Sequence, residues 1–243
     1  MTAPHIAHAI WQTLRISVPT IWQGLRGSLT PEATDRRLAQ WSAAIVQRAR
    51  IELRVEGSEH ATPGESFVLM SNHQSLYDVP VIYQALDRRI RMVAKKELFR
   101  VPLWGRAMQR AGFISLDRQS RERSRQTLLA SADVLRTGTS VWIAPEGTRS
   151  KDGRLGPFRR GGFHLALQSG CRILPITIVG TRAVLPAKSA RVTEGCRVRV
   201  VVHAPIDSRE YGEEGRAELS ERVRAIIASS LLLGESERAS SGG

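Results

Sequence analysis

A histidine and an aspartate stand five residues apart in the segment SNHQSLYD, directly after the apolar run 67–70. A carboxylate that holds one imidazole nitrogen leaves the other nitrogen free to take a proton. His73 and Asp78 are therefore candidates for a general base and its support. Five residues along a straight helix place two side chains ~140° apart. The pair can meet only if His73 lies in the turn before the helix that begins near Asp78.

The residues around this pair suit such a turn. Ser71, Asn72 and Ser75 are turn and N-cap formers that follow an expected strand. The plainer interpretation is that His73 caps the helix and Asp78 merely belongs to its first turn. The spacing alone favours that interpretation, so other segments must decide.

Two further segments place an arginine just beyond the end of an expected strand. They are GFISLDR, which ends in Arg118, and APEGTRS, which contains Arg149; Lys95 and Lys96 follow another strand. Ligands of open α/β sheets gather at the carboxyl ends of the strands, and cations there can clamp a phosphate. Each cation alone would be an ordinary surface charge. Together, beside a candidate base, they predict a site for a phosphorylated substrate.

The elements that must hold these side chains alternate between strand and helix from residue 51 onward. Strands are expected at 51–55, 67–70, 91–94, 113–116, 141–144, 173–179 and 197–202. Helices are expected at 79–86, 103–109, 121–135, 162–168 and 217–233. This alternation is typical of an α/β domain with a mixed, largely parallel sheet flanked by helices. We assign that domain to residues 51–233 and expect residues 234–243 to be a disordered tail.

Residues 1–50 have a different pattern and predict an amphipathic two-helix hairpin. The first helix carries an apolar stripe from Ile10 to Leu25, which Pro19 is expected to kink or interrupt. Three of the chain's five tryptophans lie in this hairpin: Trp11, Trp22 and Trp41. Tryptophan beside arginine on an amphipathic helix is typical of a membrane-interface element. The alternative is a helix pair that simply packs on the main core.

The composition is that of a globular but strongly basic protein. Among 243 residues, 36 Lys and Arg stand against 23 Asp and Glu, a formal net charge of +13. Such a surface attracts nucleic acid, anionic lipid or phosphorylated small molecules. No run of ~18 apolar residues predicts a spanning helix. Glycine-rich nucleotide motifs and the Gly-x-Ser-x-Gly elbow are absent, which disfavours nucleotide binding and a serine hydrolase.

Four blocks in this order resemble those of the glycerolipid acyltransferases, the family typified by 1-acyl-sn-glycerol-3-phosphate acyltransferase. NHQSLYD, residues 72–78, is similar to the family's His-x4-Asp block. GFISLDR, PEGTRS and ILPITIVG, at residues 112–118, 145–150 and 173–180, resemble the second, third and fourth blocks. The matching region runs from about residue 66 to 180, near half of the chain.

The resemblance implies transfer of a fatty acyl group to the free hydroxyl of 1-acyl-sn-glycerol 3-phosphate, giving phosphatidic acid. His73 would be the general base, supported by Asp78. The acceptor oxygen would attack the thioester of acyl-CoA or acyl carrier protein without a covalent intermediate. The acceptor's phosphate would be bound by Arg118 and Arg149 in a pocket shaped by Glu146 and Gly147, with Lys95 and Lys96 beside it. The acyl-chain side would be formed by Pro175 and its apolar neighbour Ile176.

The family implies no metal and no tightly held cofactor, and we expect no nucleic-acid partner. Because a lysophospholipid and its product live in the bilayer, the hairpin tryptophans would seat the enzyme on the cytoplasmic face of the membrane, as a peripheral or monotopic protein. The positive charge would favour anionic lipid. Two alternatives stay open. One is the same chemistry on glycerol 3-phosphate, a lyso-ornithine lipid or another lysophospholipid; the other is a non-catalytic basic module that binds membrane or nucleic acid.

Overall fold

The computed structural model describes residues 3–117 and 119–240. Within them, seven strands form one sheet in the order β1-β7-β6-β2-β5-β3-β4. The strands are β1 (Glu52–Glu56), β2 (Val68–Ser71), β3 (Ile90–Lys95), β4 (Ile114–Leu116), β5 (Ser140–Ile143), β6 (Ile173–Val179) and β7 (Arg197–Val202). All neighbouring strands are parallel except β6 and β7, which are antiparallel. The predicted mixed, largely parallel sheet is confirmed.

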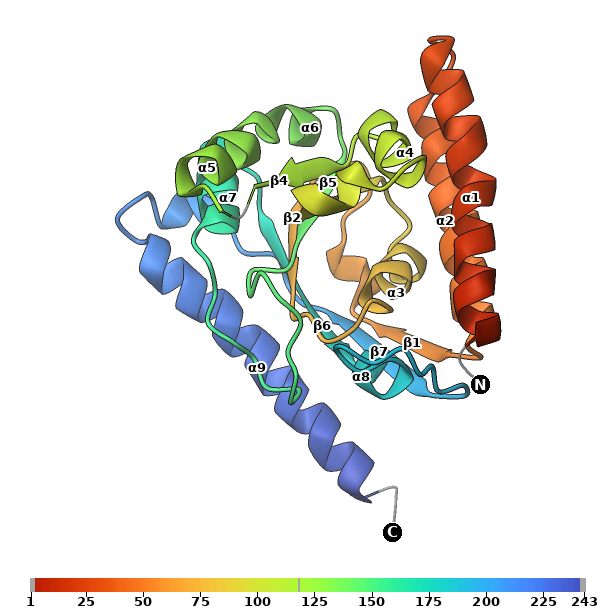
Figure 1. The fold of residues 1–243 in the computed structure, drawn as a ribbon. Coiled ribbons are helices and arrows are strands. Elements are labelled where there is room, and N and C mark those ends of the chain that lie inside the picture. Colours follow the sequence, from red (N-terminus) through yellow and green to blue (C-terminus); the bar gives the residue numbers. More distant parts are fainter. Residues whose placement is uncertain (1–2, 118, 241–243) are drawn as a thin grey trace.

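Helices cover both faces of the sheet (Figure 1). One face packs on α3 (Asp78–Ala85), with the hairpin of α1 (Ala3–Leu25) and α2 (Pro31–Arg48) beyond it. The other face packs on α5 (Arg121–Ala130), α6 (Ala132–Arg136), α7 (Gly161–Ser169) and α9 (Arg216–Ser240). The shorter elements are α4 (Trp104–Arg110), α8 (Thr181–Val184) and the 3-10 turns η1 (Ser58–His60), η2 (Lys96–Arg100) and η3 (Ser208–Glu210).

The central strand β2 shows why the sheet needs both layers. Successive side chains of a strand point to opposite faces. Leu69 joins the core beneath α3, whereas Val68 and Met70 join the core beneath α7 and α9. All of these side chains are fully buried. A strand covered on both faces reads as a continuous apolar run, which is the pattern that predicted it.

Two helices extend further than predicted. α1 continues through Pro19 without interruption. The proline costs one backbone hydrogen bond, but the carbonyl it leaves free belongs to Arg15, an exposed residue that water can reach. α9 continues to Ser240, into the segment predicted to be disordered. Residues 235–239 include Glu, Arg and Ala, which are strong helix formers and can prolong a helix that is already docked.

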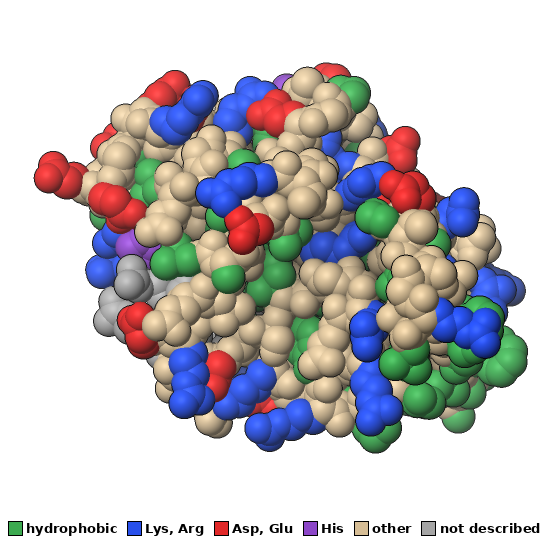
Figure 2. Space-filling model, turned by 90° about the horizontal axis from the view of Figure 1, so that it is seen from above, with side chains coloured by type: hydrophobic (Ala, Val, Ile, Leu, Met, Phe, Trp, Pro, Cys, Tyr) green, Lys and Arg blue, Asp and Glu red, His purple; other side chains and the backbone are tan. Residues whose placement is uncertain are grey.

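The α1–α2 hairpin lies along one side of the molecule and presents apolar side chains outward. The exposed apolar residues of α1 are Ile6, Ile10, Trp11, Leu14, Val18, Trp22 and Leu25. Figure 2 shows hydrophobic side chains gathered on this side of the molecule, with basic side chains among them. The buried residues of α1 are polar instead: His5, Gln12, Ser17 and Thr20. Among the described residues, no helix combines the length and apolar composition needed to cross a bilayer.

Candidate active site

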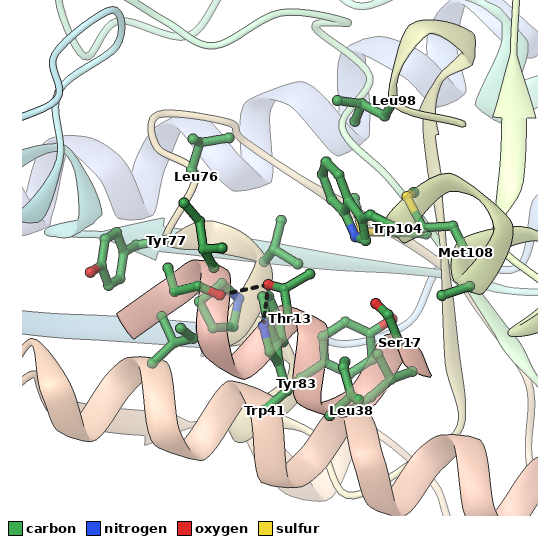
Figure 3. A pocket seen from close by; sticks show the side chains of 18 of the residues that line it. Thr13, Ser17, Leu38, Trp41, Leu76, Tyr77, Tyr83, Leu98, Trp104 and Met108 are labelled. Carbon is green, nitrogen blue, oxygen red and sulfur yellow. Dashed lines mark hydrogen bonds between the residues drawn. The ribbon is translucent and has the colours of Figure 1, made fainter. Parts of the chain in front are cut away.

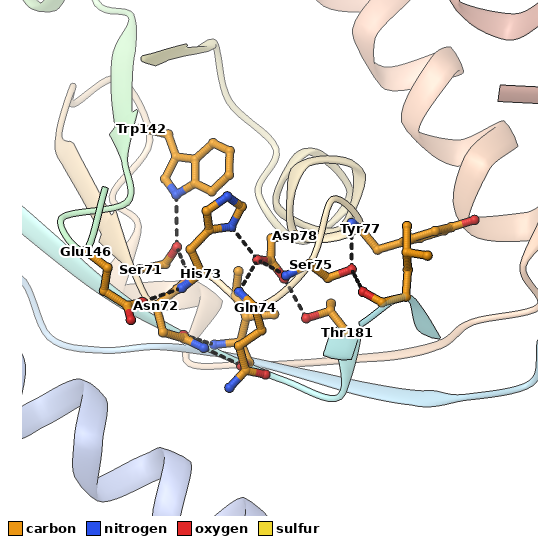
Figure 4. A network of polar contacts seen from close by, with 12 residues as sticks. Ser71, Asn72, His73, Gln74, Ser75, Tyr77, Asp78, Trp142, Glu146 and Thr181 are labelled. Atoms are coloured by element: carbon orange, nitrogen blue, oxygen red, sulfur yellow. Dashed lines mark hydrogen bonds and ion pairs between the residues drawn. The ribbon is translucent and has the colours of Figure 1, made fainter. Parts of the chain in front are cut away.

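The histidine–aspartate pair forms in the way its spacing requires. β2 ends at Ser71 and α3 begins at Asp78, so His73 lies in the loop between them. Its Nδ1 atom lies 2.7 Å from Asp78 Oδ2 (Figure 4). A carboxylate only accepts hydrogen bonds, so Nδ1 donates and Nε2 is left free to take a proton. The prediction that His73 precedes the helix is confirmed.

Asp78 is fully buried and bonded through both oxygens. Oδ2 also accepts from the backbone N–H groups of Gln74, at 2.7 Å, and Ser75, at 2.9 Å. Oδ1 accepts from the Thr181 hydroxyl at 2.5 Å. A buried carboxylate is costly unless hydrogen bonds replace its water, and these donors do so. Asp78 is therefore a fixed, charged support for the imidazole.

Thr181 is a part of this site that the sequence reasoning missed. It follows Gly180 directly after β6, at the sheet edge where β2 also ends, and is fully buried. β2 pairs with β6 in parallel, so the residues after both strands meet at that edge. Thr181 directly follows the fourth block, ILPITIVG, and that position was the signal that could have identified it.

The loop that carries His73 is fastened to the sheet by Asn72. Its Nδ2 donates to Ile178 O and its Oδ1 accepts from Ile178 N, both at 2.8 Å. These two bonds mimic strand pairing and extend the contact between β2 and β6. Trp142 Nε1 donates to Ser71 Oγ at 3.0 Å, and its ring meets the His73 ring edge-on with centroids 6.2 Å apart. The imidazole is thus confined by Asp78 and by Trp142.

The Glu146 carboxylate holds the His73 backbone. Its Oε1 accepts from His73 N–H at 2.7 Å and its Oε2 from Gly156 N–H at 2.9 Å. Ser150 N–H donates to His73 O at 2.7 Å. The backbone N–H and C=O groups of His73 are therefore both hydrogen-bonded to the EGTRS segment. Burial raises the pKa of the Glu146 carboxyl, against the opposing effect of the two backbone donors. Both carboxylate oxygens are thus engaged by backbone N–H groups, and a part for Glu146 in shaping a phosphate pocket stays a prediction.

The other predicted phosphate ligands have different surroundings. Arg149 is half-buried and, within the described residues, has no acidic partner. Lys96 Nζ is paired with Asp117 Oδ2 at 2.8 Å, and Lys95 is exposed at the end of β3. Arg118 lies outside the described residues. Gly147 has φ +69°, a left-handed conformation that L side chains rarely adopt, so the turn after Glu146 favours glycine.

A large apolar cavity of about 510 Å³ lies where the hairpin packs on the α/β domain (Figure 3). Residues of α1, α2, α3 and α4 form its walls, and Leu76 and Tyr77 of the His73 loop line it too. Trp41 also lines the cavity and donates from Nε1 to Thr13 Oγ1 at 3.2 Å. Of the three hairpin tryptophans predicted at the membrane, Trp41 therefore points inward, whereas Trp11 and Trp22 are exposed.

The cavity differs from the predicted acyl-chain side. Pro175 and Ile176 are buried within β6, and neither lines the cavity. Its walls come from segments as far apart in sequence as His5 and Val192. No local pattern joins such segments, which is why the sequence reasoning missed it.

Replacing Glu146 with Gln tests its contact with His73. Glutamine has one acceptor oxygen, so one of the two buried N–H groups meets an NH2 group instead and stays unpaired, at a cost of ~1–3 kcal/mol. We expect a lower melting temperature and a kcat lowered about tenfold or more through a displaced His73. Steady-state kinetics and thermal unfolding measure both. Glu221→Gln, an exposed glutamate on α9, is the control; a wild-type kcat in the Glu146 variant would contradict the role.

The raised pKa of Glu146 also predicts a pH dependence of stability. Deprotonation costs more in the folded protein than in the unfolded chain, so this group lowers stability as pH rises from the ordinary carboxyl range, about 4.5. Glutamine does not titrate. As pH rises through that window, the melting temperature should therefore decrease more steeply in wild type than in the Glu146→Gln variant. Equal slopes in the two proteins would contradict the raised pKa of Glu146.

The fold and the site define a class of protein. A helix-flanked, largely parallel sheet carries a bonded His–Asp pair and an arginine-bearing loop beyond the carboxyl ends of its strands. The Acyltransferase family model matches residues 52–179, more than half of the chain. The chain belongs to that family.

Several relatives share much of the chain. It is 33% identical over 176 residues to the chloroplastic 1-acyl-sn-glycerol-3-phosphate acyltransferase LPAT1 of Arabidopsis thaliana, covering 71% of this chain and 49% of the relative. It is 35% identical over 176 residues to the human 1-acyl-sn-glycerol-3-phosphate acyltransferase alpha, covering 72% and 62%. It is 33% identical over 201 residues to the mouse alpha protein, covering 82% of this chain and 70% of the relative. The chain thus spans about half the length of the plant relative.

A solved structure has the same fold. It is the crystal structure of the 1-acyl-sn-glycerophosphate (LPA) acyltransferase PlsC from Thermotoga maritima. The TM-score is 0.74 at 24% sequence identity, over 93% of this chain and 96% of that one. This likeness supports the fold described above.

Proposed function

We propose that this protein transfers a fatty acyl group from a thioester to the free hydroxyl of 1-acyl-sn-glycerol 3-phosphate, which gives phosphatidic acid. The observation that carries the proposal is the His73–Asp78 pair, held at the sheet edge beside the loop of Arg149. A general base next to a cation without an acidic partner suits an acceptor that has both a hydroxyl and a phosphate. The relatives named for this reaction support the choice of acceptor.

In the proposed mechanism His73 Nε2 takes the proton of the acceptor hydroxyl as its oxygen attacks the thioester carbonyl. The new C–O bond forms, the tetrahedral intermediate collapses, and the C–S bond breaks. The leaving thiolate takes the proton back from Nε2. Asp78 stabilises the imidazolium that exists between the two transfers. No residue becomes acylated, and the donor is acyl-CoA or acyl carrier protein.

The apolar cavity is the proposed place for an acyl chain during this reaction. Leu76 and Tyr77 line it and lie between His73 and Asp78 in sequence, so the cavity adjoins the base. Each buried CH2 group contributes ~0.8 kcal/mol. A chain that enters the cavity would hold its carbonyl near His73 through binding energy remote from the reacting atoms.

Assays of the purified protein on a panel of lysolipids, with labelled acyl-CoA and acyl carrier protein as donors, test the acceptor. We expect 1-acyl-sn-glycerol 3-phosphate to be acylated fastest, ahead of lyso-ornithine lipid, other lysophospholipids and glycerol 3-phosphate. Turnover of a phosphate-free acceptor with none on 1-acyl-sn-glycerol 3-phosphate would refute the proposed acceptor while leaving the acyl-transfer chemistry intact.

Replacing Arg149 with Ala should weaken binding of the phosphorylated acceptor. A hydrogen bond to a charged group contributes ~1.5–3 kcal/mol, which corresponds to a KM for the acceptor raised about 10- to 100-fold. The kcat should change less, because the base is untouched. Arg136→Ala, an exposed arginine on α6 before the start of β5, is the charge-matched control. An unaltered acceptor KM in the Arg149 variant would argue against a phosphate contact.

We further propose that the outer face of α1 rests on the membrane. Trp11 is 63% exposed and Trp22 is 53% exposed, within a stripe of exposed aliphatic residues on a strongly basic protein. Exposed apolar area of this kind marks a contact surface, and basic charge adds attraction to anionic lipid.

The double replacement of Trp11 and Trp22 with Ala tests that contact. Removing two aromatic side chains from the interface should lower partitioning to anionic vesicles about tenfold or more, measured by sedimentation. Trp41→Phe, which changes an inward-pointing ring, should keep vesicle binding. Point variants are preferable to deleting residues 1–50, because the hairpin also buries core residues of α2 such as Ile45. Full pelleting of the double variant would contradict the contact.

A further inference from the structure

The apolar cavity ends in a cation that the proposed reaction does not use. Arg37 of α2 lines the cavity. Its guanidinium donates to Thr20 Oγ1 at 3.1 Å and to Gln23 Oε1 at 2.7 Å. Within the described part of the chain no carboxylate pairs with it. Arginine has five N–H donors, so a positive group with unused donors stands in an apolar wall.

A buried hydroxyl without a partner lies three residues along α1 from Thr20, which Arg37 contacts. Ser17 lines the same cavity, is only 2% exposed, and its Oγ has no hydrogen-bond partner among the described residues. Ser17 and Thr20 are three residues apart on α1, so they are neighbours on one helix face. Leaving a buried hydroxyl unpaired costs free energy. A ligand oxygen between Arg37 and Ser17 would remove that cost.

The cavity is long enough for one acyl chain between this polar end and the His73 loop. Figure 3 shows Leu76 and Tyr77 at one end and Ser17 at the other. α1 lines the cavity from His5 to Thr20, a span of ~22 Å at 1.5 Å per residue. One leaflet of a bilayer's hydrocarbon core, the length of one lipid chain, is ~15 Å.

We propose that the cavity binds a single-chain lipid with an anionic head group, carboxylate or phosphate. The head group lies at Arg37 and Ser17, and the chain points towards Leu76. A free fatty acid and a lysophospholipid share this chemistry. In this orientation the head group is remote from His73, so the ligand does not react. It occupies the space that the proposed function gives to an acyl chain and therefore acts as a competitive inhibitor.

Isothermal titration of the full chain in detergent-free buffer, below the critical micelle concentrations, tests the site. The probes are laurate, dodecyl phosphate and dodecanol, which share one chain and differ in head group. We expect at least one of the anions to bind about tenfold or more tightly than dodecanol, as a charge-assisted hydrogen bond implies. The anion that binds more tightly identifies the natural ligand as a fatty acid, if it is laurate, or a phosphorylated lipid, if it is dodecyl phosphate. Equal affinity for all three probes would overturn the proposal.

Variants separate this site from the general positive charge of the surface. Arg37→Gln should abolish the preference for the anion, and Arg37→Lys should keep part of it. Arg36→Gln removes the exposed neighbour on the same helix and should keep all of it. If Arg36→Gln lost as much of the preference for the anion as Arg37→Gln, the proposed site would be overturned, because the preference would then depend on net charge.

Ser17→Ala gives a second measurement if Arg37→Gln unfolds. The variant should weaken binding of the anion several-fold and leave the affinity for dodecanol unchanged. An unchanged affinity for the anion would count against the site. Binding is measured without a thioester. A protein that fails on every lysolipid can therefore still pass this test, so the two proposals fail separately.

Discussion

Replacing His73 with Ala lowers the rate of acyl transfer by ~10²–10⁴, because a positioned general base contributes that much. The variant removes Nε2, the proposed proton acceptor. The loop should keep its shape, since Glu146 and Ser150 hold the His73 backbone and not its ring. The measurements are kcat with a labelled thioester, the circular dichroism spectrum and vesicle binding. We expect only kcat to fall.

His164→Ala is the matched control for this variant. The His164 side chain is 23% exposed and faces Glu213, whereas the His73 side chain is 20% exposed. Its loss should leave kcat close to wild type. An unchanged rate in the His73 variant would remove His73 from the mechanism and favour a non-catalytic, membrane-binding role for the chain.

Replacing Asp78 with Asn separates the charge of this residue from its geometry. Three donors converge on Oδ2: His73 Nδ1 and the N–H groups of Gln74 and Ser75. An asparagine oxygen can occupy that place, and its NH2 group can then donate to Thr181 Oγ1. The bonds therefore survive, but the negative charge that stabilises the imidazolium is lost. We expect kcat to fall by ~10²–10⁴ with a nearly unchanged acceptor KM.

Thr181→Val provides a milder change at the same carboxylate, against which the loss of kcat in the Asp78 variant is compared. It removes one bond to Oδ1 and leaves the charge in place, so the loss of kcat should be smaller. If both variants lost the same activity, the geometry of Asp78 would matter and its charge would not. Melting temperatures decide whether either variant acts through folding, because Asp78 and Thr181 are both fully buried.

The order and type of the elements could be predicted from the sequence because they depend on local patterns. The largely apolar run 173–179 coincides with β6, and the valine-rich run 197–202, in which arginine and valine alternate at the start, coincides with β7. The number of residues per turn predicted that His73 precedes the helix if it meets Asp78. The spacing of the His-x4-Asp and EGTR blocks indicated the family, which the comparisons confirmed.

Other properties depend on which distant segments meet, and only the tertiary structure decided them. Trp41 and Trp11 look alike in sequence, but Trp41 faces the cavity because α2 packs between α1 and α3. The Glu146 carboxylate accepts from the N–H of His73, 73 residues away. Thr181 reaches Asp78 because β2 and β6 are neighbours in the sheet. Periodicity within one segment determines an element and its buried face, whereas the partner of a buried polar group is determined by strand order and helix packing.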